Sequence, residues 1–189
     1  MTTHDAHAVL DWIVTEALES HSHVSETLTL HESTDDDMLD IPAENVRKKA
    51  KIYISYWCNF KHLLNSLEQS LLKINQDNFG YNIWPQYDGN IVRLNEYDSD
   101  YKGEYDWHTD GSTDNDAYDI KFTLLLNTSL ESYEGGKFYL FTSGSNYIDK
   151  LDNPGDVVIF KSHIPHRVSP VTKGKRHSLT LFYNGPKFQ

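Results

Sequence analysis

Cysteine is almost absent from this 189-residue chain, which contains only Cys58. A single thiol forms no intrachain disulfide and builds no cysteine-based zinc cluster, so we expect a small buried side chain there and a reducing, cytoplasmic compartment. Long apolar runs are missing too. No stretch reaches the length of a membrane span, and the first ten residues lack the basic and apolar segments of a signal peptide. We therefore expect no membrane partner.

Basic residues are in the minority, with 17 Lys and Arg against 28 Asp and Glu and a formal net charge of -11. Proteins that bind a nucleic-acid backbone need clustered Lys and Arg, so a nucleic-acid partner is not expected. A small charged metabolite or a protein substrate stays open. The length suits a single domain, residues 1–189, with one active site.

Residues 1–79 show helical periodicity. Apolar residues recur at helical spacing between Asp5 and Ser20, which predicts a short amphipathic helix. The helical pattern resumes at Pro42 and predicts one long helix or two in series. Its apolar stripe is expected to be core and consists of Leu63, Leu64, Leu67, Leu71, Leu72 and Ile74. We expect residues 1–79 to form a helical support.

Residues 80–189 change to short strands separated by Gly, Pro, Asn and Asp turns, which is typical of an antiparallel sandwich or barrel. The predicted strands are Tyr81–Ile83, Asn90–Leu94, Tyr105–Thr109, Asp119–Asn127, Lys137–Phe141, Asp156–Phe160, Arg167–Val171 and His177–Asn184. This order predicts a mainly β fold, a jelly roll with N-terminal helices packed on one sheet.

His108 and Asp110 are the first candidate metal ligands. They stand two residues apart on a predicted strand, so both side chains leave the same face. A further histidine would complete the two-histidine, one-carboxylate triad that binds iron(II) and leaves positions for a bidentate cosubstrate and O2. By spacing alone, the third ligand is His163, His166 or His177.

Arg176 adds context to this pattern, because an H-x-D motif alone is weak evidence for a metal site. Arg176 stands ten residues after His166, with Ser178 two further along on the same strand face. The guanidinium offers two parallel donors and the hydroxyl a third, which suits a carboxylate ligand.

Further motifs follow one another in a recognisable order between about Asn82 and Pro186. They are Tyr97 and Tyr105 before His108-Thr109-Asp110, the apolar strand Phe122–Leu126, and the segments Tyr133–Gly136, Pro154–Asp156, His166–Val171 and Lys173–Arg176. In this order they resemble the iron(II)- and 2-oxoglutarate-dependent oxygenases of the prolyl 4-hydroxylase type, including the PKHD-type hydroxylases.

The resemblance implies a double-stranded β-helix, the cupin-like form of the jelly roll. It implies that His108, Asp110 and His166 bind iron(II), and it selects His166 over His163 because the ligand precedes the Arg-Val-x-Pro run. Arg176 would bind the far carboxylate of 2-oxoglutarate, with Ser178 beside it. Three further residues are candidate contacts to this cosubstrate or else ordinary strand and core residues: Tyr97, Tyr105 and Thr123.

The implied activity is hydroxylation with O2, coupled to decarboxylation of 2-oxoglutarate to succinate and CO2, with ascorbate as a candidate reductant. Retention of Asp110 argues against halogenation, because the family's halogenases carry a small residue there. The primary substrate stays open among a protein side chain, an amino acid and a small metabolite. Two alternatives are a zinc-type metal hydrolase with the same ligands, which leaves Arg176 and Ser178 unexplained, and a non-catalytic jelly-roll binding module.

The polar loop Gly111–Asp119 follows the H-x-D strand and is predicted to lie near the mouth of the barrel. Its Asp114 and Asp116 suit local turn hydrogen bonds. The alternative is that they attract a neutral or cationic substrate.

Overall fold

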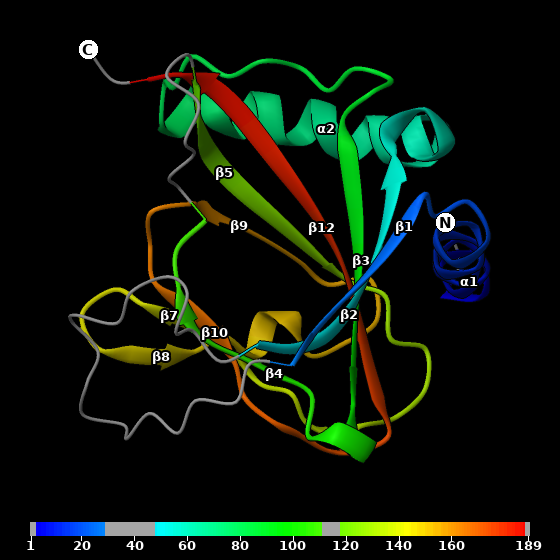
Figure 1. Ribbon diagram of the computed structural model, residues 1–189. Coiled ribbons are helices and arrows are strands. Elements are labelled where there is room, and N and C mark those ends of the chain that lie inside the picture. The colour runs from blue at the N-terminus through cyan, green and yellow to red at the C-terminus, as the bar shows by residue number, and fades with distance from the viewer. Residues whose placement is uncertain (1–2, 29–47, 111–117, 188–189) are drawn as a thin grey trace.

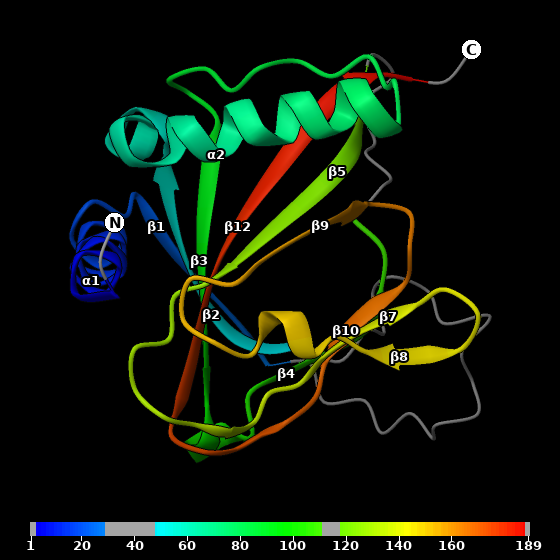
Figure 2. The ribbon, with the colours of Figure 1, turned by 180° about the vertical axis from the view of Figure 1, so that it is seen from behind.

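The computed structural model describes residues 3–28, 48–110 and 118–187. Two α-helices, α1 (Thr3–Glu19) and α2 (Trp57–Asn78), lie beside a curled antiparallel sheet (Figure 1 and Figure 2). Helix α1 confirms the helix expected between Asp5 and Ser20. Neither α1 nor α2 is long and apolar enough to span a membrane.

The described strands are β1 (His23–Leu28), β2 (Lys48–Tyr56), β3 (Ile91–Asp98), β4 (Glu104–His108), β5 (Tyr118–Asn127), β6 (Glu134–Gly135), β7 (Phe138–Phe141), β8 (Ser145–Tyr147), β9 (Val157–Lys161), β10 (His166–Val168), β11 (Val171–Lys173) and β12 (Lys175–Pro186). The large sheet has the order β8-β7-β10-β4-β2-β3-β12-β5-β9, with β1 paired to β2, while β6 and β11 form a separate pair. The sheet curls from the long strands β3, β12 and β5 to the short strands β10, β7 and β8 (Figure 1). This arrangement matches the mainly β fold predicted.

Strand β2 lies where the sequence predicts a helix from Pro42. It pairs with β3 and with β4, so it belongs to the middle of the sheet. The run Ile52-Tyr53-Ile54 places β-branched and aromatic side chains on alternate faces, which suits a pleated strand better than a helix. Residues 1–79 thus contribute two strands as well as two helices, and the expectation of a purely helical support was wrong.

All but one of the predicted strands overlap a strand of the structure. The exception is Tyr81–Ile83, whose backbone bonds to a side chain instead. The Asn75 amide donates to the Tyr81 carbonyl at 2.7 Å, and its own carbonyl accepts from the Tyr81 N–H at 3.1 Å. The predicted strand Arg167–Val171 is divided into β10 and β11 at Pro170, which has no N–H to donate.

Successive residues of β3, β5 and β12 face opposite sides of the sheet, as strand geometry requires. One set packs against α1 and α2 in an apolar core that includes Val92, Leu94, Phe122, Leu124, Leu126, Leu179, Leu181 and Tyr183. The other set faces the inside of the curl, where a second cluster includes Ala50, Tyr97, Leu125, Phe138, Leu140, Phe160, Val168 and Val171. The inner face surrounds the candidate site.

Helix α2 carries only part of the predicted core stripe. Leu64 and Leu71 are buried, but Ile74 is 41% exposed. Cys58 is exposed as well, so the expectation of a buried thiol was wrong. Trp57 and Phe60, three residues apart, define the face that packs on the sheet, and Cys58 lies about 100° further round the helix than Trp57.

Candidate active site

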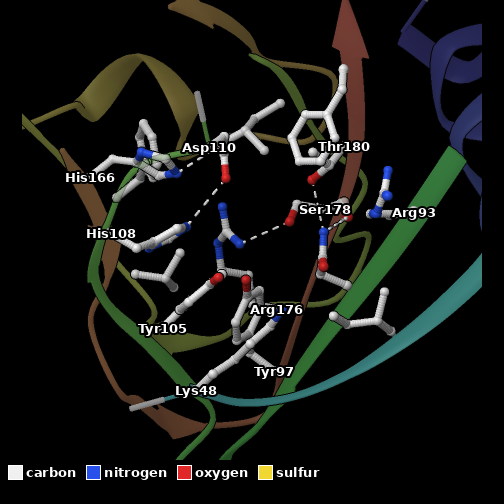
Figure 3. Close-up of a pocket in the computed structure, with 16 residues that line it drawn as sticks. Lys48, Arg93, Tyr97, Tyr105, His108, Asp110, His166, Arg176, Ser178 and Thr180 are labelled. Atoms are coloured by element: carbon white, nitrogen blue, oxygen red, sulfur yellow. Dashed lines mark hydrogen bonds and ion pairs between the residues drawn. The ribbon is translucent and has the colours of Figure 1, made fainter. Parts of the chain in front are cut away.

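His108, Asp110 and His166 meet at one end of an internal cavity (Figure 3). Strand β10 pairs with β4 so that His166 lies directly opposite His108, and Asp110 follows β4. The His108 Nε2 is 3.6 Å from Asp110 Oδ1, and the His166 Nε2 is 3.3 Å from Asp110 Oδ2. One ligand atom of each residue lies within 4.8 Å of the others. These three groups suit a single metal ion.

Both histidines are oriented by the backbone. The Nδ1 of His108 is 2.7 Å from the Asp106 carbonyl, and that of His166 is 3.0 Å from the Ile164 carbonyl. A carbonyl only accepts, so each Nδ1 carries the proton and each Nε2 lone pair is available to a metal. Burial, followed by the nearby His166, lowers the pKa of His108 to about 3. His108 is therefore neutral near pH 7, as a metal ligand must be.

Asp110 is held as a carboxylate. Burial alone would raise its pKa, but the contacts with His166 and His108 and the hydrogen bond from the Thr123 hydroxyl hold the pKa below its ordinary value. Thr123, on β5, is fully buried and donates to Asp110 Oδ2 at 2.8 Å. The sequence predicts Thr123 as a contact to 2-oxoglutarate. The structure places it against Asp110 and outside the cavity lining, where it supports the carboxylate.

Arg176, on β12, lies on the inner face of the sheet and is only 1% exposed. Its Nη1 donates to Ser178 Oγ at 3.1 Å, and its Cζ lies 5.5 Å from the centre of the Tyr97 ring. Its Nη2 is buried and has no hydrogen-bond partner in the described part of the chain. A buried, unsatisfied cationic donor is unfavourable, so the site fits a ligand that supplies a carboxylate.

Gly136 makes room for the stem of Arg176. Its φ is +58°, in the left-handed region that favours glycine. A Cβ at this position would lie 2.9 Å from Arg176 Cδ and 3.0 Å from Val171 Cγ2. The glycine that ends the motif Tyr133–Gly136 thus allows the arginine to pack behind the cavity.

The triad and Arg176 line the same cavity, which has a volume of about 220 Å³. Of the other predicted contacts, Ser178, Tyr97 and Tyr105 also line it. The Tyr105 ring stacks on that of His108, with centroids 3.4 Å apart. Burial raises the pKa of Tyr97 to about 12 and also raises that of Tyr105, so both hydroxyls stay protonated donors near pH 7.

The structure shows which of the three candidate histidines lies beside His108 and Asp110. His166 joins His108 and Asp110, whereas His163 is exposed and outside the cavity lining. His177 faces the other way along β12, and its Nε2 is 3.2 Å from Glu96 Oε2.

Four polar residues of the cavity lining were missed in the sequence: Lys48, Arg93, Asn95 and Thr180. Arg93 and Asn95 alternate with Tyr97 along β3, a signal that they share its face. Lys48 gave no such signal because its segment was predicted to be helical. Its Nζ lies 4.4 Å from the centre of the Tyr105 ring, and burial lowers its pKa to about 8. The predicted roles of Asp114 and Asp116 lie outside the described residues.

Comparison with known proteins identifies a family that matches part of this chain. Residues 92–184 match the model of a family described as the 2OG-Fe(II) oxygenase superfamily, and this span contains the metal triad and Arg176. Residues 92–184 of this chain belong to the 2OG-Fe(II) oxygenase superfamily. The order of motifs in the sequence had indicated the same family.

Curated relatives of this oxygenase segment include PKHD-type hydroxylases. One from Idiomarina loihiensis is 39% identical over 87 residues, which cover 45% of this chain and 38% of the relative. One from Crocosphaera subtropica is 34% identical over 118 residues, which cover 60% of this chain and 48% of the relative. The chain thus aligns with less than half the length of each.

Solved structures of prolyl hydroxylases share the fold across nearly the whole chain. A Pseudomonas putida prolyl-4-hydroxylase matches with a TM-score of 0.63 and 18% identity, covering 96% of this chain and 88% of that one. A viral collagen prolyl hydroxylase from Paramecium bursaria Chlorella virus-1, in complex with 2-oxoglutarate, matches with a TM-score of 0.56 and 13% identity, covering 95% and 91%. At these identities the likeness concerns the fold, and it confirms the predicted double-stranded β-helix.

Proposed function

We propose that the protein is an iron(II)- and 2-oxoglutarate-dependent dioxygenase that hydroxylates an amino acid, a protein side chain or a small metabolite. The observation that carries this proposal is the buried Nη2 of Arg176, which lacks a partner among the described residues. It belongs to a side chain lining the same cavity as the two histidines and the carboxylate. Neither a metal hydrolase nor a binding module needs a buried, unpaired guanidinium in the same cavity as three metal ligands.

The metal would be bound by the Nε2 atoms of His108 and His166 and by the carboxylate of Asp110. O2 is the oxidant, which bound iron(II) would activate: one oxygen atom enters the substrate hydroxyl and the other enters succinate, while 2-oxoglutarate loses CO2. The backbone carbonyls behind the two Nδ1 atoms and the hydroxyl of Thr123 fix the three ligands before the metal arrives. We also propose ascorbate as the reductant that keeps the iron in the iron(II) state.

The cosubstrate would be oriented by Arg176 and Ser178, which would bind its far carboxylate through charge-assisted hydrogen bonds. Tyr97 and Tyr105 remain protonated and line the same space, where they would serve as neutral donors. Apolar side chains complete the inner wall and limit the access of water to the reacting groups: Leu125, Phe138 and Val168.

The test is a titration of metal-free protein with iron(II) and 2-oxoglutarate under argon. We expect a weak visible charge-transfer band that requires both components, followed by succinate formation when O2 is admitted. His166→Ala should abolish the band, and His163→Ala, a matched control on an exposed histidine, should retain it. A wild type that binds zinc and shows no band with iron(II) and 2-oxoglutarate would contradict the proposal.

A further inference from the structure

Arg93 is a second arginine in the cavity, well separated from Arg176. It lies on β3 opposite Thr180 of β12 and lines the same cavity as the metal triad. Thr180 is four residues beyond Arg176, so the two backbone positions are about 13 Å apart along the strands. In Figure 3, Arg93 lies on the far side of Ser178 and Thr180 from His108. Arg93 and Arg176 therefore occupy separate places in the cavity, with Ser178 and Thr180 between Arg93 and the metal triad.

The Arg93 guanidinium packs against an aromatic ring and makes no polar contact with the described residues. Its Cζ lies 4.6 Å from the centre of the Phe182 ring, which it stacks against. Among the residues that the structure describes, it has no hydrogen bond or ion pair. Its polar neighbours are bonded to each other, since the Asn95 amide donates to Thr180 Oγ1 at 2.8 Å. The donors of Arg93 are thus available to a ligand.

Arg93 and Phe182 also stand at the boundary of a second hollow. This hollow has a volume of about 290 Å³ and shares both residues with the cavity that His108, Asp110 and His166 line. Its other walls include Tyr87, which is 67% exposed, and Tyr118. The pair therefore lies where a molecule entering from the outer hollow would approach the metal triad.

The proposed cosubstrate leaves the charge of Arg93 without a partner. The two acidic groups of 2-oxoglutarate would meet the metal and Arg176, and the Asp110 carboxylate would bind the metal. Asp110 influences Arg93 electrostatically but forms no ion pair with it. No carboxylate of residues 3–28, 48–110 or 118–187 forms an ion pair with Arg93, so the guanidinium is suited to a counter-charge from a bound molecule. A planar guanidinium offers two parallel donors, the geometry that a carboxylate accepts.

We propose that Arg93 determines substrate specificity by binding a carboxylate of the primary substrate, with Phe182 fixing the plane of the guanidinium. The substrate is then a small carboxylic acid or a free amino acid, not an internal residue of a peptide chain. This inference rests on the proposed function and narrows it. The chain has a net charge of -11, yet two arginines, Arg93 and Arg176, line this cavity. The charge of the cavity therefore differs from that of the chain as a whole.

The test compares acids with neutral molecules of the same shape. Wild-type protein saturated with iron(II) and 2-oxoglutarate under argon is titrated calorimetrically with free amino acids and small carboxylic acids, each beside its carboxamide. We expect at least one acid to bind tenfold or more tightly than its amide. Arg93→Met keeps the apolar stem without the charge. This variant should bind the acid no more tightly than the amide. Arg93→Lys should retain part of the preference.

Several results would overturn the proposal. One is a panel in which no acid binds wild type more tightly than its amide; another is a phosphate monoester that binds more tightly than every carboxylate. Arg176→Gln is the matched control, and it should weaken 2-oxoglutarate binding far more than Arg93→Met does. If the two variants lost 2-oxoglutarate affinity equally, Arg93 would be a contact to the cosubstrate. That result would overturn the inference but leave the proposed function intact.

A wild type that fails to bind 2-oxoglutarate with iron(II) would instead contradict the proposed function, before any acid is added. Melting temperatures establish whether each variant folds. If Arg93→Met does not fold, the comparison of acids with amides on wild type and on Arg93→Lys still decides the matter.

Discussion

The two faces of β12 carry different kinds of residue. Toward the helices, Leu179 and Leu181 are buried in an apolar core. Toward the cavity, Arg176, Ser178 and Thr180 present a guanidinium and two hydroxyls from the same stretch of backbone. Packing on one face therefore holds the polar groups on the other in fixed positions. Substitutions on the two faces should have separable effects, one on stability and the other on ligand binding.

The largest effect is expected for Asp110→Ala, at the metal end of the cavity face. Removal of the carboxylate should reduce iron(II) affinity by more than the roughly 10- to 100-fold typical for a group that supports a ligand, and should abolish 2-oxoglutarate turnover. The melting temperature should change little, because Asp110 is outside both apolar clusters. Metal titration and succinate assays measure this, with His163→Ala as the control. Loss of metal in His163→Ala but not in Asp110→Ala would refute the ligand assignment.

Leu181→Ala tests the opposite face. The side chain is 1% exposed, and its truncation should lower the free energy of unfolding by about 2–5 kcal/mol. Turnover per folded molecule should be retained. Urea denaturation gives the stability, and succinate formation at low temperature gives the activity. A stable variant that has lost iron(II) binding would show that the two faces are not separable.

Arg176→Gln tests the residue of the cavity face that is proposed to bind the cosubstrate. The change leaves the cosubstrate carboxylate without its charged partner and should weaken 2-oxoglutarate binding by about 2–4 kcal/mol, with little change in iron(II) affinity. Calorimetric titration with 2-oxoglutarate at saturating metal measures the loss. Unchanged 2-oxoglutarate affinity would move the anchor to another residue.

Thr123→Val is expected to have an intermediate effect, because Thr123 acts through Asp110. Its hydroxyl donates to Oδ2, and valine keeps the shape without the donor. Iron(II) affinity should fall about tenfold, near the lower limit for groups behind a metal ligand. The 2-oxoglutarate affinity at saturating metal should stay within twofold of wild type. A larger effect on 2-oxoglutarate than on iron would make Thr123 a cosubstrate contact, as the sequence first indicated.

The smallest effect concerns Glu96, which shares a face with Val92 and Leu94. The hydrogen bond with His177, and then the charge of Lys175, hold the pKa of Glu96 below its ordinary value. The folded state thus keeps this carboxylate ionised where the unfolded chain protonates it. The resulting stability is present above the unfolded pKa and is lost as the pH falls through the folded pKa.

Glu96→Gln should therefore lower the free energy of unfolding by at most about 1 kcal/mol at pH 7. The difference from wild type should shrink toward zero in acid. Urea denaturation of both proteins at pH 7 and pH 3 measures it. A difference that grows as the pH falls would show that the glutamate is not stabilised in its ionised form.

The parts of the fold that the sequence predicted are those with strong local signals. Strands β5 and β12 lie between turn residues and carry long runs of strand formers, and the spacing of His108 and Asp110 places both on one face. Strand β2 was missed because a short apolar run beside a helix is ambiguous by periodicity. Alternation with Tyr97 could have placed Arg93 on the same face of β3, but its position opposite Thr180 depends on the order of strands, which is a property of tertiary pairing.

Strand β12, which carries Arg176, lies in the sheet between β3 and β5. Strand β2, early in the chain, lies between β4 and β3. Each of these pairings closes a long loop, so chain entropy opposes it until many other contacts form. We therefore expect the cavity to be assembled late in folding, because its lining is complete only when residues 175–186 lie between β3 and β5. Ligand-binding ability should appear together with the cooperative folding transition, with no earlier, partly competent state.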